Sequence, residues 1–175
     1  MVSTLLRRQA NKFRWSRAGA DANHKSPNLY QEIKLAIPEG FWVIPNNSPY
    51  FDKTIGPFYL TKRDEKWVIG MMTAERHVRG KGFVAGLVTA TLADYAMGHV
   101  VCRALWPDKA ELDANQIKLV TVSLNVDFIA SPPVGAWLEV ETNVIKTGRV
   151  CFAESIIKMS NRVMMRANAS YIVRE

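Results

Sequence analysis

The sequence predicts an α+β domain in which an antiparallel β-sheet wraps around one long central α-helix. Two observations carry this prediction: one apolar run at residues 82–101, and several segments that alternate apolar and polar residues with a period of two. Polar or glycine-containing turns separate those segments. The helix is apolar nearly all round and each strand has one apolar face, so helix and sheet are expected to bury each other.

The length of 175 residues and a hydrophobic content of 48% fit one domain with a real core. We expect a basic N-terminal extension at residues 1–30 and the folded domain at residues 31–175. Residues 1–26 hold six of the 23 Lys and Arg residues but one of the 16 acidic residues, so most of the net charge of +7 belongs to this segment. The rest is nearly balanced, which argues against a nucleic-acid partner.

The first residues contain no apolar stretch long enough for a secretory signal. We expect an arm or helix that packs Leu6, Ala10 and Phe13 on the domain, although the arginine-rich composition also resembles a mitochondrial transit peptide. Cys102 and Cys151 are far apart and form no CxxC motif, so neither a metal site nor a disulfide framework is indicated. A cytoplasmic location is therefore expected.

The elements before the helix are expected in the following order. Residues 27–57 are rich in Pro and Asn and predict a loop with at most a short helix around residues 30–36. A strand pair follows at residues 58–62 and 66–75, joined by a polar turn. The helix is expected from about residue 85 to residue 105, and it stops before Pro107.

Four strands are expected after the helix, at residues 120–128, 138–144, 150–159 and 163–173. Each should bury one face. The last three are separated by the turns Thr147-Gly148-Arg149 and Ser160-Asn161-Arg162. In the first strand, one face is expected to be apolar and buried: Val120, Val122, Leu124, Val126 and Phe128.

Asp94 is an isolated carboxylate in the apolar run, and no Lys or Arg lies between Lys81 and Arg103 to pair with it locally. Together with His99, this charge argues against a membrane-spanning helix. A buried, unpaired carboxylate is costly, so Asp94 should lie in a wet crevice or hold its proton more tightly than usual. Either state suits a general base or a nucleophile, whereas a structural aspartate bonded to backbone amides or to a tyrosine hydroxyl is the alternative.

Gly86 lies in the first turn of the predicted helix, where backbone N–H groups are unpaired and can bind a developing oxyanion. Eight residues separate Gly86 from Asp94, which corresponds to about 12 Å along one helix. That distance is too long for both to act on one carbonyl carbon. If both act on the same substrate, Asp94 must come from a second copy whose helix packs antiparallel about a two-fold axis.

The segment AGLVTATLAD at residues 85–94, preceded by His77-Val78-Arg79-Gly80-Lys81-Gly82 and followed by VSLNVDFIASPPVG at residues 122–135, resembles the hotdog-fold acyl-CoA thioesterases. The branch that it resembles is that of the phenylacetate-degradation thioesterases. The resemblance covers about residues 57–173. It implies a hotdog fold and a homodimer, or a homotetramer built as a dimer of dimers.

The resemblance implies a role for several residues. Asp94 would be the base or nucleophile, the Gly86 N–H would bind the thioester carbonyl, and Thr121 would orient the water or the carboxylate. The family pattern has Asn at the position of Arg79 and His at that of Ala85, while His77 is retained. These positions would contact the substrate, and no cofactor is expected apart from coenzyme A as part of that substrate.

Three side chains have two interpretations each. Arg79 could bind a phosphate or pair with the neighbour's Asp94, or it could be a solvent-facing loop residue. Arg149 could meet the phosphates of coenzyme A, or it could be a turn residue. His99 lies five residues after Asp94, about 140° around the helix, so we interpret it as a core or interface histidine rather than a catalytic one.

The sequence therefore predicts an acyl-CoA thioesterase whose site lies at a dimer interface. The first alternative, favoured by Ala85 and Arg79, is a degenerate hotdog protein that binds acyl-CoA or only dimerises. A module that binds nucleic acid or a membrane surface through the basic extension is the remaining alternative.

Overall fold

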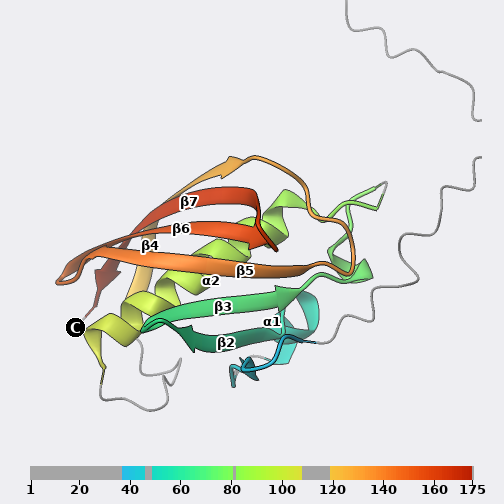
Figure 1. The fold of residues 1–175 in the computed structure, drawn as a ribbon. Coiled ribbons are helices and arrows are strands. Elements are labelled where there is room, and N and C mark those ends of the chain that lie inside the picture. The colour runs from blue at the N-terminus through green and yellow to red at the C-terminus, as the bar shows by residue number, and fades with distance from the viewer. Residues whose placement is uncertain (1–36, 46–48, 81, 108–118, 175) are drawn as a thin grey trace, which may run out of the picture. The chain divides into compact units, whose positions relative to one another are not determined.

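The computed structural model describes residues 37–45, 49–80, 82–107 and 119–174. The elements, in chain order, are β1 (Trp42–Val43), α1 (Pro49–Thr54), β2 (Phe58–Arg63), β3 (Lys66–Met72), the 3₁₀ turn η1 (Glu75–His77), α2 (Gly86–Leu105), β4 (Leu119–Phe128), β5 (Trp137–Lys146), β6 (Val150–Met159) and β7 (Arg162–Val173) (Figure 1). The predicted long helix and the six predicted strands are all present.

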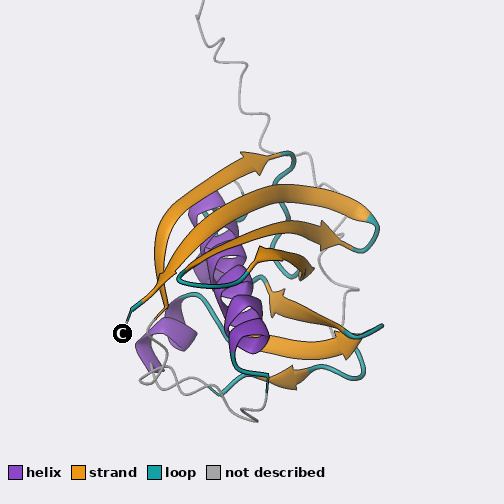
Figure 2. Ribbon diagram, turned by 90° about the vertical axis from the view of Figure 1, so that its left-hand side faces the viewer, coloured by secondary structure: helices purple, strands orange, loops and turns teal. Residues whose placement is uncertain are grey.

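The strands form one antiparallel sheet in the order β1-β2-β3-β5-β6-β7-β4. The sheet curves around α2, which crosses its inner face (Figure 2). β4 follows α2 in the chain but pairs with β7, so it lies at an edge of the sheet. The predicted α+β architecture, a sheet wrapped around one helix, is confirmed.

The turns explain why the strand ends lie where they do. The β2–β3 hairpin turns through Asp64 and Glu65, which both have positive φ (49° and 62°), the backbone that a tight two-residue hairpin requires. The β6–β7 turn uses Ser160 with φ 52°, and the β5–β6 turn uses Gly148 with φ 141°. These short connections hold neighbouring strands in antiparallel register.

α2 begins after Ala85 and ends before Pro107, as predicted. Its buried side chains recur at intervals of three and four residues, which forms the face that packs on the sheet. Buried strand residues such as Ile69, Leu138 and Ile157 complete the core under this face. Asp94 lies on the helix at the border of this face and is half-buried.

The expectation for residues 27–57 was incomplete, because β1 and α1 both lie within this segment. β1 pairs through Trp42 and Val43 with Leu60 and Tyr59, a long-range contact that a local pattern does not reveal. β3 ends at Met72 rather than at residue 75, because the chain turns there into η1. The expected helix at residues 30–36 and the packing of Leu6, Ala10 and Phe13 lie outside the described residues.

All described residues belong to one structural unit that comprises residues 33–175. The extension predicted at residues 1–30 lies outside the described part of the chain, and it stays a prediction. In that described part, no helix has the length and apolarity needed to cross a membrane.

Candidate active site

The N-terminus of α2 exposes backbone donors. Ala85 is the N-cap with φ −63° and ψ 136°, and alanine has no side-chain acceptor for the first-turn amides. Its own N–H donates to the His77 carbonyl at 2.9 Å, and Val88 N–H donates to the Ala85 carbonyl at 2.9 Å. Within the described residues, the N–H groups of Gly86 and Leu87 have no acceptor. These two amides can donate hydrogen bonds to an anionic oxygen.

Phe128, at the end of β4, packs directly over Gly86. A Cβ added at Gly86 would lie 3.0 Å from Phe128 Cε1 and 3.2 Å from Phe128 Cζ. Any larger residue at position 86 would therefore have to displace the ring. Glycine at this position lets an apolar side chain approach the helix N-terminus closely while the amide stays accessible.

Asp94 is held by two hydroxyl groups. Thr121 Oγ1 donates to Asp94 Oδ1 at 3.0 Å. The Tyr171 hydroxyl lies 3.4 Å from the same Oδ1 and 3.2 Å from the Asp94 carbonyl oxygen. The carboxylate is thus half-buried and bonded to two hydroxyl groups, and none of the ion pairs of the described residues includes it. The contact with Tyr171 is also the one expected if Asp94 has a structural rather than a catalytic role.

Thr121 reaches Asp94 because β4 contains a bulge. Thr121 pairs with Tyr171 and Ser123 pairs with Ser170, so Val122 has no partner on β7. One extra residue shifts the alternation of side chains, which places Thr121 on the same inner face as Leu124, Val126 and Phe128. The prediction that Val120 and Val122 share a face with Leu124, Val126 and Phe128 is therefore wrong.

β4 also differs from the expectation of one buried face. Val122, Leu124 and Phe128 are exposed, because β4 is an edge strand and α2 covers only part of it. This edge is long, since β4 spans ten residues. Unpaired backbone groups along such an edge form a template for pairing with another strand.

Exposed apolar side chains gather where β4 meets the start of α2. Four of these side chains are more than half exposed: Leu87 (74%), Phe128 (57%), Phe83 (55%) and Ile129 (55%). Leu87 lies in the first turn of α2, and Phe128 contacts Gly86. A group of large exposed apolar residues of this kind marks a surface that binds another molecule.

Tyr171 is a site residue that the sequence did not single out. It comes from β7, 77 residues after Asp94, and only 2% of its surface is exposed. Burial, reinforced by the neighbouring Asp94, raises the pKa of its hydroxyl, so the group remains a donor across the physiological range. Its position on the apolar face of a strand is indistinguishable from that of an ordinary core tyrosine.

The other predicted site residues occupy different environments. His77 is 1% exposed, and its Nδ1 accepts a hydrogen bond from Ala74 N–H at 3.0 Å, so its ring orders the loop before α2. Burial lowers the pKa of His77. Arg79 is exposed in that loop, and its N–H donates to the Phe83 carbonyl. Arg149 is exposed at the β5–β6 turn, where its carbonyl accepts from Val173 N–H.

His99 is half-buried and stacks on Tyr95 with ring centroids 6.1 Å apart. Burial, followed by the nearby Arg103, lowers the pKa of His99 to about 4, so the ring is neutral at physiological pH. It makes no contact with Asp94 among those recorded for the described residues. Within the same residues, no group of three or more His, Cys, Asp or Glu side chains could hold a metal ion.

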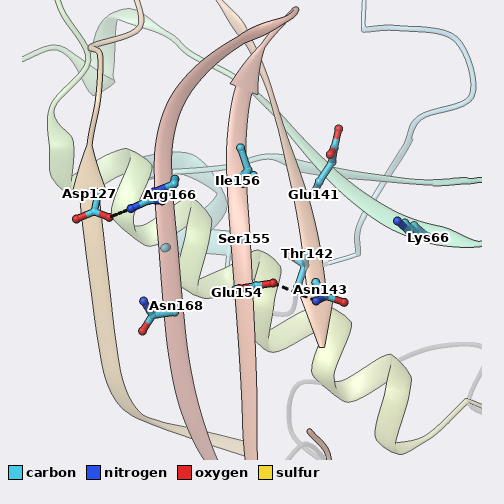
Figure 3. A pocket seen from close by; sticks show the side chains of 11 residues that line it. Lys66, Asp127, Glu141, Thr142, Asn143, Glu154, Ser155, Ile156, Arg166 and Asn168 are labelled. Carbon is cyan, nitrogen blue, oxygen red and sulfur yellow. Dashed lines mark hydrogen bonds and ion pairs between the residues drawn. The ribbon is translucent and has the colours of Figure 1, made fainter. Parts of the chain in front are cut away.

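A hollow of about 500 Å³ lies on the outer face of the sheet, away from Asp94. Figure 3 shows its polar lining, with α2 behind the strands. Asn143 donates to Glu154 at 3.1 Å and Arg166 donates to Asp127 at 2.8 Å, whereas the buried hydroxyls of Thr142 and Ser155 have no hydrogen-bond partner among the described residues. None of the predicted site residues lines it.

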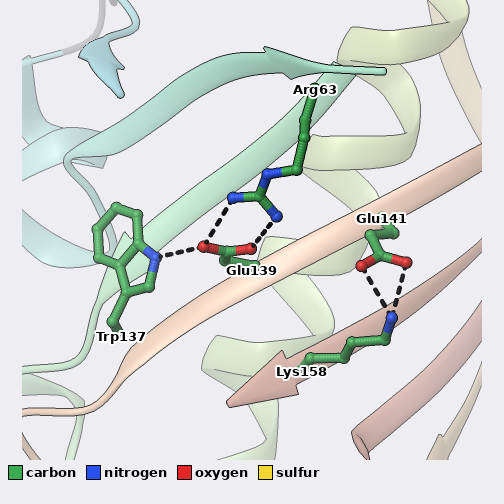
Figure 4. A network of polar contacts seen from close by, with 5 residues as sticks. All are labelled: Arg63, Trp137, Glu139, Glu141 and Lys158. Carbon is green, nitrogen blue, oxygen red and sulfur yellow. Dashed lines mark hydrogen bonds and ion pairs between the residues drawn. The ribbon is translucent and has the colours of Figure 1, made fainter. Parts of the chain in front are cut away.

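A second hollow, of about 620 Å³, contains two ion pairs (Figure 4). Arg63 donates to both oxygens of Glu139 at 3.0 and 3.5 Å, and Lys158 donates to both oxygens of Glu141 at 2.8 Å. Because carboxylates already neutralise these cations, they are poor anchors for a phosphate. Neither hollow is lined by Asp94 or Gly86.

Comparisons with known proteins identify the family of the chain. The family model of the thioesterase superfamily matches residues 81–152, which contain both Gly86 and Asp94. A Pseudomonas aeruginosa protein named as a candidate esterase, PA0474, is 31% identical over 139 residues, or 78% of this chain and 97% of that protein.

Solved structures show the same fold. A Ralstonia eutropha protein, titled as a phenylacetic acid degradation-related candidate thioesterase, superposes with a TM-score of 0.59 at 19% identity over 73% of this chain and 92% of its own. The Bacillus halodurans protein BH2602, crystallised with CoA, superposes with a TM-score of 0.59 at 20% identity over 75% of this chain and 82% of its own. The chain therefore belongs to the thioesterase superfamily and has the hotdog fold.

Proposed function

We propose that the protein hydrolyses an acyl-CoA thioester. The observation that carries the proposal is the pair of features on α2: a carboxylate oriented by Thr121, and free amides at the helix N-terminus. Asp94 would activate water or attack the thioester carbonyl directly. The Gly86 N–H would bind the carbonyl oxygen as negative charge develops on it. The coenzyme A found with the Bacillus halodurans protein supports this substrate class.

The site would form between two copies of the chain. Gly86 and Asp94 are eight residues apart on one straight helix, about 12 Å, so one chain cannot bring both to one carbonyl carbon. Among the described strands, only β7 pairs with β4, and the exposed Leu87 and Phe128 lie beside Gly86; the free edge and these side chains supply a surface for a second copy. A two-fold axis that packs the helices antiparallel would place Asp94 of one chain near Gly86 of the other.

A panel of acyl-CoA substrates, with free thiol release as the readout, tests this function. Asp94→Asn keeps the shape but removes the base, so kcat is expected to fall by about 100-fold or more. The matched control is Asp127→Asn, which alters an exposed aspartate of β4 that pairs with Arg166 on the outer face. This control is expected to retain activity within about twofold. Full activity in Asp94→Asn would contradict the assignment.

A catalytically inactive acyl-CoA-binding protein is the second candidate. Ala85 at the helix N-cap favours it, because this residue brings no side-chain hydrogen bond to the thioester. The two candidates differ in the same experiment. Calorimetric binding of coenzyme A without thiol release from any substrate would support the binding protein, whereas release that depends on Asp94 supports the hydrolase.

A further inference from the structure

Tyr171 and Thr121 converge on one oxygen of Asp94. The two residues are direct partners in the β4–β7 pairing, so their side chains leave the sheet side by side toward α2. Thr121 Oγ1 is 3.0 Å and the Tyr171 hydroxyl is 3.4 Å from Asp94 Oδ1. Asp94 Oδ2 accepts no hydrogen bond from the residues that the structure describes. The two oxygens of this carboxylate are therefore in different environments.

The Tyr171 ring is fixed in place. It is almost completely buried in the core, and its Cε1 lies 3.7 Å from the position that a Cβ at Gly98 would occupy, one helical turn after Asp94. The hydroxyl cannot swing to another partner without moving this packed ring. The hydroxyl oxygen lies 3.4 Å from Asp94 Oδ1 and 3.2 Å from the Asp94 carbonyl oxygen, so both acceptors are within its reach.

We propose that Tyr171 is a positioning residue of the active site: with Thr121 it holds Asp94 Oδ1, so that Oδ2 alone is presented to water or to the thioester carbon. This inference rests on the proposed function and deepens it. A hydrogen bond to a charged acceptor is stronger than one to a neutral acceptor, so the phenol stabilises the ionised carboxylate in the orientation that the reaction needs.

The competing explanation is that the phenol serves only the fold. In that case it would donate to the Asp94 backbone carbonyl and tie α2 to β7. The two roles differ in one measurable property. A donor to the carboxylate changes the pH at which Asp94 gains its proton, whereas a donor to the backbone carbonyl does not.

Tyr171→Phe removes the hydroxyl and keeps the ring. We expect kcat to fall by about tenfold, and the acidic limb of the pH–rate profile to move up by about one pH unit, because the ionised carboxylate loses a donor. Tyr59→Phe is the matched control, since Tyr59 is also a buried tyrosine but packs against Trp137 on β5. The control should leave the acidic limb in place. A lower kcat with an unmoved limb would overturn the proposal.

A second measurement does not depend on activity. With ¹³C-labelled aspartate carboxyl groups, the Asp94 resonance is identified by its loss in Asp94→Asn and is titrated in the wild type and in Tyr171→Phe. An upward shift of the midpoint supports the hydrogen bond even if no acyl-CoA is hydrolysed, an outcome that would defeat only the proposed function. Equal midpoints would overturn the inference.

If Tyr171→Phe does not fold, 3-fluorotyrosine at position 171 gives the same information. It preserves the ring but makes the hydroxyl more acidic and hence a stronger donor. The Asp94 midpoint should then move to lower pH than in the wild type. A midpoint equal to that of the wild type would again overturn the inference.

Discussion

Gly86 combines two properties that no other residue offers at its position. It is the first residue of α2, so its N–H has no partner within the helix. It also leaves room for Phe128, whose ring would lie 3.0 Å from an added Cβ. The absence of a side chain thus keeps an amide accessible beside an apolar wall.

Two substitutions at position 86 distinguish the effect of losing the N–H group from the effect of adding side-chain volume. Gly86→Ala adds a Cβ but keeps the N–H, whereas Gly86→Pro adds a ring and removes the N–H. Proline is well tolerated at the first helical position, and the extended backbone of Ala85 (φ −63°, ψ 136°) suits a residue before proline. The Phe128 ring, which is exposed, must shift in both variants, and we expect both to fold.

The prediction is a loss of about 100-fold or more in kcat for Gly86→Pro relative to Gly86→Ala, because an oxyanion donor is removed. Circular dichroism checks that α2 is retained in both variants. If the two variants have equal kcat values, the Gly86 amide does not bind the carbonyl oxygen.

At the scale of elements, α2 contains a glycine that the fold does not require. Gly98 lies inside the helix, and its nearest neighbour to an added Cβ would be Tyr171 Cε1 at 3.7 Å, an ordinary contact distance. Gly98→Ala should raise the free energy of unfolding by about 0.5–1 kcal/mol, because glycine is a poor helix former. Chemical denaturation measures this change.

Gly70→Ala in β3 is the opposite case and serves as the comparison. Its added Cβ would lie 2.1 Å from Trp137 Cζ2, so the indole would have to move. We expect destabilisation of about 1–3 kcal/mol or more, as for other overpacked sites. If the Gly98→Ala protein is less stable than the wild type, the added methyl group must clash with a neighbour. Such a result would contradict the expected gain in stability.

The elements differ in how far the sequence predicts them. The strand from Trp137 to Lys146 follows its alternation of residues, with Leu138 and Val140 buried, because its pairing is regular there. In β4 the same reasoning fails at Val122, since a bulge is decided by the partner strand and not by local alternation. The family resemblance implies that Thr121 orients the water or the carboxylate, although the alternation of residues places it on the face opposite Val120; in the structure Thr121 Oγ1 donates to Asp94 Oδ1.

In the candidate site, too, some residues can be recognised from the local sequence and others cannot. Asp94 and Gly86 are recognisable because a charge and a helix start are local features of the chain. Tyr171 is not, since its contact with Asp94 spans 77 residues and depends on how the sheet curves around α2. Only the tertiary structure reveals that a core tyrosine touches the carboxylate.

The proposed chemistry requires two copies of the chain. The two halves of the proposed chemistry lie on one helix, about 12 Å apart. The exposed edge of β4 and the apolar residues beside Gly86 supply the surface on which a second copy would pack. If the site is shared between chains, two variants that are each inactive can complement one another in a mixed dimer.

Recovery of activity in a mixture of two inactive variants tests the shared site. Asp94→Asn and Gly86→Pro are each purified, mixed in equal amounts, unfolded and refolded together, and assayed for thiol release. If each site takes Asp94 from one chain and Gly86 from the other, every mixed dimer regains one intact site. Random pairing then predicts a recovery of about a quarter of the wild-type activity. If the mixture stays as inactive as its two components, Asp94 and Gly86 of different chains do not form a common site, and the proposed shared site is contradicted.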